Sequence, residues 1–239
     1  MSYRESPNES PKSIDSLIRE GYATDISSYL GRGWDLLQQK LGSFIGFTAI
    51  FVFVIPIALA IIAAILDPAS VDPSTNRPST GIAPLLNAAS FIVSPALEAG
   101  FYLVALKLAK QRLTSFSDFF RGFHYFLPLL LARLVTSILI VLGFLLLIIP
   151  GIYLAVAYGL VFPLILERKM DFWQAMETSR RVITKRWFSF FGLGLLLFLI
   201  NLVGLLPFGL GLLITIPLSY CTYIAAYESV FGLQLSSDE

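Results

Sequence analysis

The stretch LLLIIPGIYLAVAYGLVFPLILERK, from Leu145 to Lys169, decides the fold because it places a proline and a glycine inside a long apolar run. The run begins upstream, and Leu134 to Leu166 contains 33 positions without a charged residue. As one straight helix it would be about 50 Å long, whereas the hydrocarbon core of a bilayer is about 30 Å thick. The run is therefore either one helix kinked at Pro150 and Gly151 or two helices that fold back on each other.

The composition of the 239-residue chain is that of an integral membrane protein. Hydrophobic residues make up 56% and charged residues 14% of the chain, whereas soluble domains carry about 25% charged residues. Lys and Arg number 17 against 16 Asp and Glu, which gives no basic excess for nucleic-acid binding. The single cysteine, Cys221, lies in an apolar run and rules out an internal disulfide. The first 40 residues hold eleven charges, so we expect no cleavable signal peptide.

Basic residues on either side of the quoted stretch favour two helices. Four Lys or Arg lie between Lys107 and Arg121, and six lie between Arg168 and Arg186. The positive-inside rule places both clusters in the cytoplasm, which requires an even number of membrane crossings between them. We therefore predict that the chain turns at the proline–glycine pair, between a span over residues 126–149 and a short span of about 24 Å over residues 151–166.

The same reasoning gives four more spans. Residues 67–81 are rich in Pro, Ser and Asp and are expected to form an external loop, and LPFG at residues 206–209 divides a charge-free run of 41 residues. The predicted fold is an all-α polytopic membrane helical bundle of six transmembrane helices arranged as three hairpins, with both termini in the cytoplasm. The predicted spans cover residues 41–66, 83–106, 126–149, 151–166, 187–206 and 210–228. This membrane domain, residues 25–232, follows a disordered polar tail over 1–24 and precedes a short C-terminal tail over 233–239.

A short amphipathic segment precedes each pair of spans. Asp25 is placed to cap the first of these segments, and Asp171 stands at the start of the third. Their apolar side chains recur at helical spacing, at Ile26, Tyr29, Leu30, Trp34 and Leu37, at Phe116, Phe119, Phe120 and Phe123, and at Phe172, Met176, Ile183 and Trp187. Such segments suit helices that lie among lipid headgroups. We predict three copies of one unit of interfacial helix, span, turn and span, although any protein of helical hairpins shows aromatic residues at the interface.

Signatures of catalysis are missing from the sequence, so we predict no enzyme, no metal site and no cofactor. The single histidine, His124, has no cluster of histidine or cysteine residues for metal binding, and no HExxH, GxSxG or phosphate-binding glycine loop occurs. Pro95, Pro163 and Pro217 interrupt the even-numbered spans, and each is expected to free a backbone carbonyl group and bend its helix.

Glu98 and Arg133 are the two ionisable residues well inside predicted spans. An unpaired charge at the centre of a spanning helix costs roughly 2.5–3.5 kcal/mol, so each is expected to have a partner or a function. Both lie roughly 11–13 Å from the cytoplasmic ends of adjacent spans, which makes them candidate partners for each other. Three interpretations remain open: a structural ion pair, an Arg133 that extends to the headgroups, and a role in a substrate or ion path.

Four segments carry a family resemblance: FSDFFRGF, IIPGIYLAVAYGLVFPLILERK, FWQAMETSRRVITKRWFSFFGL and IPLSYCTYIAAYESVFG. They are similar to bacterial six-span membrane proteins of unknown function, which are relatives of the membrane region attached to some glycerophosphodiester phosphodiesterases. The likeness covers about residues 25–232, and its most specific parts are the I-P-G-I-Y-L turn and the A-x-x-x-S-R segment after it. The resemblance implies a helical bundle in the bacterial inner membrane and carries over no catalytic residue, because the phosphodiesterase domain is separate.

Two functions are expected from these features. The first is a non-catalytic membrane protein that organises lipid or holds a membrane-protein partner. The basic residues expected to contact anionic lipid are Arg180, Arg181, Lys185 and Arg186. The second is a small transporter or channel with a polar path near Glu98 and Arg133. The expected location is the bacterial inner membrane, and a similarity of the N-terminal surface helix to cyanobacterial sequences makes the thylakoid membrane an alternative.

Overall fold

The computed structural model describes residues 13–66 and 82–234, and the predicted external loop over 67–81 lies outside the described residues. Within them every regular element is a helix, which confirms the all-α class. The elements in chain order are α1 (Ile14–Glu20), α2 (Ile26–Gln39), α3 (Leu41–Ala49), the π-helical turn η1 (Ile50–Val54), α4 (Ile55–Leu66), α5 (Ile82–Ala109), the 3₁₀ helix η3 (Phe116–Tyr125), α6 (Phe126–Leu146), α7 (Ile148–Ala157), α8 (Val161–Arg168), α9 (Phe172–Thr184), α10 (Trp187–Leu205) and α11 (Leu212–Phe231).

Five helical stretches among the described residues are long and apolar enough to cross a membrane. They are Leu41–Leu66, Pro84–Ala109, Phe116–Leu146, Ile148–Arg168 and Trp187–Leu205. Each overlaps one of the predicted spans. Helix α11 overlaps the remaining predicted span and has 20 residues, but its threonine, serine and tyrosine residues make it less apolar than these five. The fold is therefore that of an all-α protein with several helices suited to a bilayer.

The long apolar run is divided at Leu147, so the predicted position of the turn at Pro150 and Gly151 is wrong by three residues. Leu147 has an extended backbone (φ −162°, ψ 151°) between the end of α6 and the start of α7. Pro150 lies in the first turn of α7, where its missing N–H removes no helical hydrogen bond. The earlier start gives Ile148–Arg168 a length of 21 residues, which removes the shortness expected for this span.

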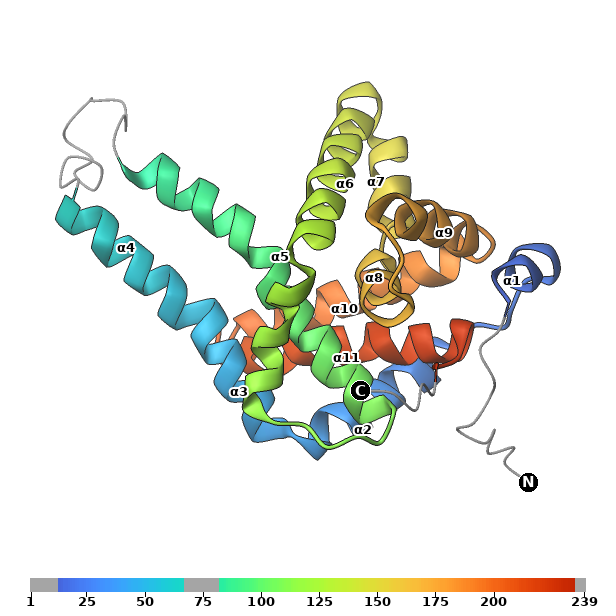
Figure 1. Ribbon diagram of the computed structural model, residues 1–239, viewed down its shortest axis with the longest axis horizontal. Coiled ribbons are helices and arrows are strands. Elements are labelled where there is room, and N and C mark those ends of the chain that lie inside the picture. Colours follow the sequence, from blue (N-terminus) through green and yellow to red (C-terminus); the bar gives the residue numbers. More distant parts are fainter. Residues whose placement is uncertain (1–12, 67–81, 235–239) are drawn as a thin grey trace.

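Helices α6 and α7 lie side by side, as Figure 1 shows. A Cβ atom added at Gly143 on α6 would lie 3.0 Å from Gly151 Cα on α7. The two backbones are therefore in close contact at a pair of glycines. Gly151 serves this packing contact rather than the turn itself.

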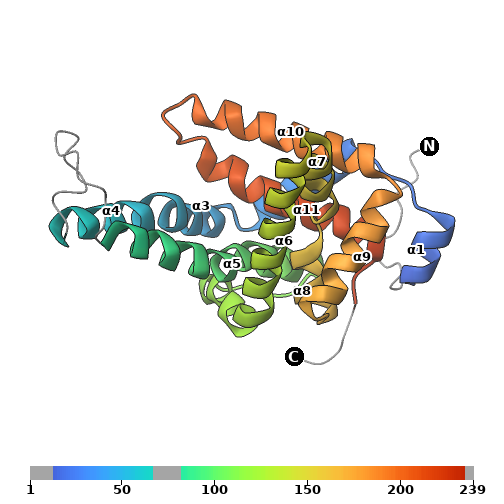
Figure 2. The same ribbon diagram turned by 90° about the horizontal axis from the view of Figure 1, so that it is seen from above.

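The long helices project in different directions from a common base, formed by α2, α3, η3, α8, α9 and the adjoining parts of α5 and α11. Figure 1 shows the arm of α4 and α5 on the left and the α6–α7 pair at the top, and Figure 2 shows the α10–α11 tip projecting separately. The base contains the aromatic core. The fully buried rings of Phe44, Phe47, Phe101 and Phe119 meet there with centroids 4.5–6.5 Å apart.

Two glycines allow helices in the base to touch through their backbones. A Cβ atom at Gly33 on α2 would lie 2.5 Å from Thr222 Oγ1 and 2.8 Å from Thr222 Cα on α11. A Cβ atom at Gly122 on η3 would lie 2.0 Å from the carbonyl oxygen of Ala96 on α5. Backbone atoms cannot move aside at these distances, so both positions require glycine.

The short helices α2, η3 and α9 begin the three predicted repeat units, and each packs against the helix that ends another unit. Helix η3 packs along α5, α9 packs against α8, and α2 packs along α11. Asp25 caps α2 as predicted, and Asp171 caps α9 in the same way, since each accepts hydrogen bonds from two backbone N–H groups in the first turn. Because α2 contacts α11, the last helix among the described residues, the contacts between the three predicted units form a closed ring.

Part of the predicted N-terminal tail is ordered, so the prediction of disorder over residues 1–24 is wrong for α1. Leu17 on α1 is buried, and α1 packs against α9. The Tyr22 hydroxyl donates to the carbonyl oxygen of Val182 (3.0 Å), and Thr24 bonds to Ser189 (2.9 Å). The apolar residues around Leu17 cover too short a stretch for the sequence to distinguish this helix from the polar tail.

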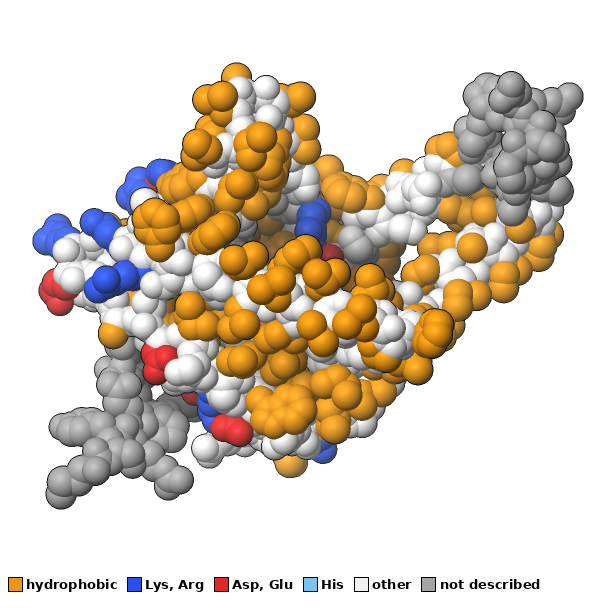
Figure 3. All heavy atoms as spheres, turned by 180° about the vertical axis from the view of Figure 1, so that it is seen from behind, with side chains coloured by type: hydrophobic (Ala, Val, Ile, Leu, Met, Phe, Trp, Pro, Cys, Tyr) orange, Lys and Arg blue, Asp and Glu red, His pale blue; other side chains and the backbone are white. Residues whose placement is uncertain are grey.

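Apolar side chains cover the projecting helices. The most apolar part of Leu41–Leu66 contains no buried residue, and large apolar side chains such as Ile65, Ile149 and Phe208 are more than two-thirds exposed. Figure 3 shows apolar side chains over the arm and the α6–α7 pair, whereas charged side chains gather on the opposite side and along the bottom of that view. This distribution is the one expected when the projecting helices contact lipid.

Candidate functional site

Glu98 and Arg133 lie on α5 and α6, at the point where these helices begin to diverge. Pro95 precedes Glu98 and cannot donate a backbone hydrogen bond to the carbonyl oxygen of Phe91. The Ser94 hydroxyl donates to that carbonyl oxygen instead (3.2 Å), so α5 continues through the proline. The helix thereby carries Glu98 toward α6.

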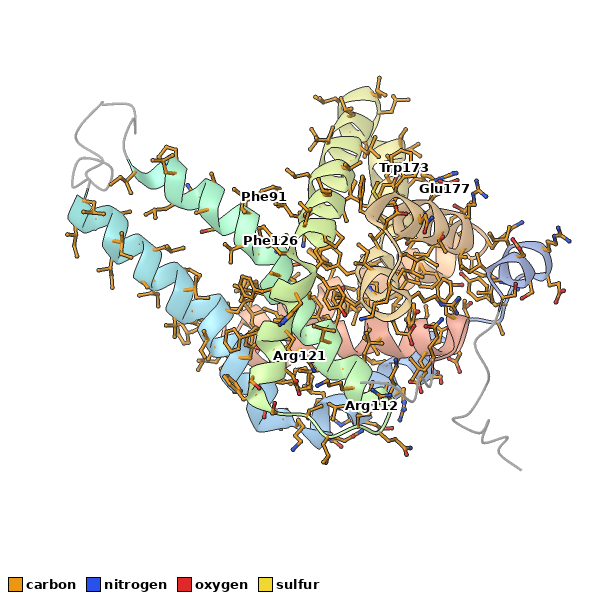
Figure 4. The ribbon with its side chains drawn as sticks, in the orientation of Figure 1. Phe91, Arg112, Arg121, Phe126, Trp173 and Glu177 are labelled. Atoms are coloured by element: carbon orange, nitrogen blue, oxygen red, sulfur yellow. The ribbon has the colours of Figure 1, made fainter. Side chains whose placement is uncertain are left out.

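The structure brings Glu98 and Arg133 together as an ion pair, in which Arg133 Nη2 donates to Glu98 Oε2. The guanidinium group of Arg133 also lies over the ring of Phe162, 5.3 Å from its centroid. The two charged side chains are 20% and 31% exposed, so neither is fully enclosed by protein. Figure 4 labels Phe91 on α5 and Phe126 at the start of α6, near the point where these two helices diverge.

Aromatic residues lie beside the pair: Tyr102 is buried, and Phe162 and Tyr220 are partly buried. Tyr102 packs against Phe162 and Tyr220 with ring centroids 6.1 and 5.0 Å apart. Arg133 Nε is buried and has no hydrogen-bond acceptor among the described residues. The arrangement can hold α5, α6 and α8 together electrostatically, and it leaves the buried Nε donor of the guanidinium group unused.

The four basic residues predicted to contact lipid lie at the C-terminal part of α9 and just after it, and most of them have protein partners. Arg180 and Arg181 both bind Glu177, at 2.8 and 2.6 Å. Hydrogen bonds from Arg180 and then Arg181 lower the pKa of Glu177 to about 2. Arg186 Nε donates to the carbonyl oxygen of Tyr22 (2.9 Å).

Lys185, the fourth of these residues, is exposed and has no ion-pair partner among the described residues. Figure 4 shows Trp173 and Glu177 on α9, away from the projecting arm of α4 and α5. Trp173 is 61% exposed. The surface of α9 therefore combines an exposed tryptophan with charges that are partly neutralised within the helix.

Ser179 on α9 is a structural residue that the sequence analysis did not single out. Its buried hydroxyl donates to the carbonyl oxygen of Ala157 (2.8 Å) and accepts from the N–H of Leu160 (3.2 Å). Both backbone groups belong to the break between α7 and α8, where helical hydrogen bonds are interrupted. Ser179 is also the serine of the A-x-x-x-S-R segment. Its place in that segment was the only feature of the sequence that pointed to it.

A second buried ion pair, also missed in the sequence, joins the ends of α5 and α8. Lys110 Nζ lies 3.1 Å from Glu167 Oε1, and the Glu167 side chain is fully buried. The same carboxylate accepts from the Tyr227 hydroxyl (3.1 Å) and from the backbone N–H of Gln234 (2.7 Å). Glu167 thus anchors the end of α11 and the segment after it. No spacing in the sequence brings residues 110, 167 and 234 together.

A cavity of about 240 Å³ opens beside this pair, between the end of α5, η3 and the end of α8. Its basic lining residues are Lys107, Lys110, Arg112, Arg121 and Lys169, with His124 at the same site. Asp118 and Glu167 are its acidic residues, and Leu103, Leu106 and Leu166 form an apolar wall. The cavity contains residues from both basic clusters flanking the long apolar run, and it does not include Glu98 or Arg133.

These features define an all-α protein with several helices fit to cross a membrane, consistent with a multi-pass membrane protein. No protein-family model, no curated protein and no solved structure matches the chain. The family resemblance carried by the I-P-G-I-Y-L and A-x-x-x-S-R segments therefore remains a prediction.

Proposed function

We propose that this chain is a non-catalytic integral membrane protein that organises anionic lipid at the cytoplasmic face of its membrane and holds membrane partners there. The proposal includes six spans in three hairpins, with α11 as the sixth span, amphipathic helices α2, η3 and α9 among the headgroups, and both termini in the cytoplasm. It also includes the bacterial inner membrane as location, with the thylakoid membrane as the alternative, and kinship with the six-span proteins named above.

One observation carries the proposal: basic residues from two distant parts of the chain line one cavity at the base, and apolar helices project from that base. Lys110 follows the second predicted span and Lys169 follows the fourth, yet both lie at the same cavity. This proximity supports an even number of crossings between them, because a single crossing would separate them by the bilayer. A basic surface next to spans attracts anionic lipid by about 1 kcal/mol for each Lys or Arg near the membrane surface.

The test is purification of the protein from its native membrane in a lipid-retaining polymer disc, followed by quantification of the enclosed lipids and proteins. We expect anionic phospholipid to be enriched at least about twofold over the bulk membrane. Discs containing an unrelated six-span protein of the same membrane serve as the control. Lipid indistinguishable from the bulk membrane, with no constant protein partner, would contradict the proposal.

A second candidate function, transport or conduction along a path near Glu98 and Arg133, is supported by the unused donor on Arg133 Nε. A buried guanidinium donor without an acceptor is a place where a small anion or a polar substrate could bind. Flux of small ions into proteoliposomes that is lost in Glu98→Gln and Arg133→Gln, with folding retained, would support transport. Equal flux in empty vesicles would exclude it for the ions tested.

A further inference from the structure

We propose that the cavity at the base is a binding site for the phosphate group of an anionic phospholipid, an assignment that rests on the proposed function and gives it a location. The cavity lies where α5 and α8, both parts of candidate spans, come to their charged ends. Figure 4 shows Arg112 and Arg121, which line it, at the lower end of the molecule, away from the tips of the α4–α5 arm and the α6–α7 pair.

The charge of the cavity favours an anion. Apart from Arg112, four Lys or Arg side chains face two carboxylates, which leaves two formal positive charges in excess. Asp118 is shared by Lys107 Nζ (2.6 Å) and Arg121 Nη1 (3.7 Å). Glu167 is occupied by Lys110, Tyr227 and Gln234. Both carboxylates are therefore engaged within the protein, and they balance only part of the positive charge around the cavity.

Lys169 is the cation best placed to receive that ligand. Its ammonium group lies over the ring of Tyr125, 4.3 Å from the centroid, and donates to the Tyr125 hydroxyl. No carboxylate of the described residues forms an ion pair with it, and the residue is exposed. A phosphate oxygen at the mouth of the cavity would supply the missing negative charge.

The backbone of Lys169 shows that a lysine at this position has a conformational cost. Lys169 ends α8 with φ 54° and ψ 30°, a left-handed conformation that glycine adopts without penalty and other residues adopt at a cost of about 1 kcal/mol. Gln111, two residues after the end of α5, also has a positive φ of 56°, and it does not line the cavity. The two residues form a matched pair, because glycine relieves the backbone at both sites and removes a cation at only one.

The apolar wall favours a lipid over a soluble phosphate. Leu106 and Leu166 are buried on the inner side of the cavity, and both belong to candidate spans. With about 30 Å³ for each water in the liquid, the cavity has room for a group of several heavy atoms. A phospholipid can place its phosphate between the cations while its acyl chains continue along the apolar helices, and basic pockets between spans bind headgroups in this way.

The test compares the wild-type protein, Lys169→Gly, Gln111→Gly and the double variant Lys169→Gly/Arg121→Gln in delipidated non-ionic detergent. Each is titrated with phosphatidylglycerol, phosphatidylcholine or inorganic phosphate, and the melting temperature reports binding through tryptophan fluorescence. We expect Lys169→Gly to weaken phosphatidylglycerol about fivefold and the double variant about 25-fold, since each cation contributes about 1 kcal/mol. Gln111→Gly is expected to bind as the wild type does.

Each contrary outcome has a separate meaning. If the wild type selects phosphatidylglycerol over phosphatidylcholine but both cavity variants bind within twofold of it, the cavity assignment is wrong and the proposed function stands. If the wild type shows no such selection, the proposed function fails as well. If inorganic phosphate displaces phosphatidylglycerol at equal concentration, the site takes soluble phosphate and the lipid assignment is overturned. A Lys169→Gly variant that differs only in melting temperature would show that the lysine serves the helix end alone.

Discussion

Ser179 on α9 accepts a hydrogen bond of 3.2 Å from the backbone N–H of Leu160, at the point where the helix pair α7–α8 is interrupted. The same hydroxyl donates to the carbonyl oxygen of Ala157 (2.8 Å). One side chain thus satisfies two backbone groups that the break has left without helical partners. Two of the four segments that carry the family resemblance therefore meet in space at these hydrogen bonds.

Ser179→Ala should lower the free energy of unfolding by about 1–3 kcal/mol, because a buried N–H and a buried carbonyl group lose their partner. Thermal unfolding in detergent measures the loss. Thr178→Ala, at the preceding residue of the same helix and only half-buried, is the matched control and should change stability by less than about 0.5 kcal/mol. Equal effects of the two variants would show that the break needs no hydrogen bonds from α9.

Gly33→Ala and Gly31→Ala should have opposite effects, although the two glycines lie two residues apart on α2. A Cβ atom at Gly33 would clash with the backbone of Thr222, whereas one at Gly31 would meet no atom within 4 Å. We expect Gly33→Ala to destabilise by about 1–3 kcal/mol and Gly31→Ala to stabilise by about 0.5–1 kcal/mol, the helix-propensity difference. A stable Gly33→Ala variant would mean that α2 is not packed on α11, and the ring of three units would be wrong.

The sequence predicted the bounds of the helices better than it predicted the turns between them and the contacts that each helix makes. Charge-free length is a local property, so most predicted spans agree with observed helices to within a few residues. The turn was misplaced because proline is equally compatible with a loop and with the first turn of a helix, and the structure uses it in α7. The backbone at Leu147 breaks the helix without any sequence signal of its own.

The candidate sites were also predictable to different degrees, because a local sequence pattern can be read in advance and a tertiary contact cannot. Glu98 and Arg133 could be paired in advance because two charges at equal depth on adjacent spans have few other partners. Lys110 and Glu167 could not, because each stands at a helix end where a charge is ordinary, and only tertiary packing joins them. The cavity needs three elements from separate parts of the chain, which no spacing rule describes.

Replacement of Glu98 or Arg133 should reveal whether their pair stabilises the protein. Glu98→Gln or Arg133→Gln alone should cost about 1–3 kcal/mol, less than the about 3–5 kcal/mol of a fully buried pair, because both side chains are partly exposed. The double variant should be more stable than the sum of the single effects predicts, by about 1 kcal/mol, since it leaves no unpaired charge. Melting temperatures of the four proteins give the coupling, and strictly additive effects would end the ion-pair interpretation.

The ion pairs of Glu177 predict a pH dependence confined to acid solution. Its folded pKa of about 2 lies below the usual value of 4.5, so its contribution to stability is present above pH 4.5 and disappears as the pH falls toward 2. The group is a third exposed, so the contribution at neutral pH should stay below about 1 kcal/mol. The difference in melting temperature between wild type and Glu177→Gln should shrink over this range. A difference that stays constant down to pH 2 would contradict the assignment.

Accessibility of single cysteines tests the crossing pattern directly. In a Cys221→Ala background, which removes the buried native thiol, cysteine is placed at Leu147, Lys185 or Phe208, all of them exposed. If the second and third predicted hairpins turn outside the membrane, a membrane-impermeant maleimide should label Leu147→Cys and Phe208→Cys from outside intact cells. Lys185→Cys should be labelled only after permeabilisation. One kinked helix through residues 134–166 would instead bury position 147 in the bilayer, which excludes both the thiolate and the maleimide. Leu147→Cys would then stay unlabelled even in permeabilised cells.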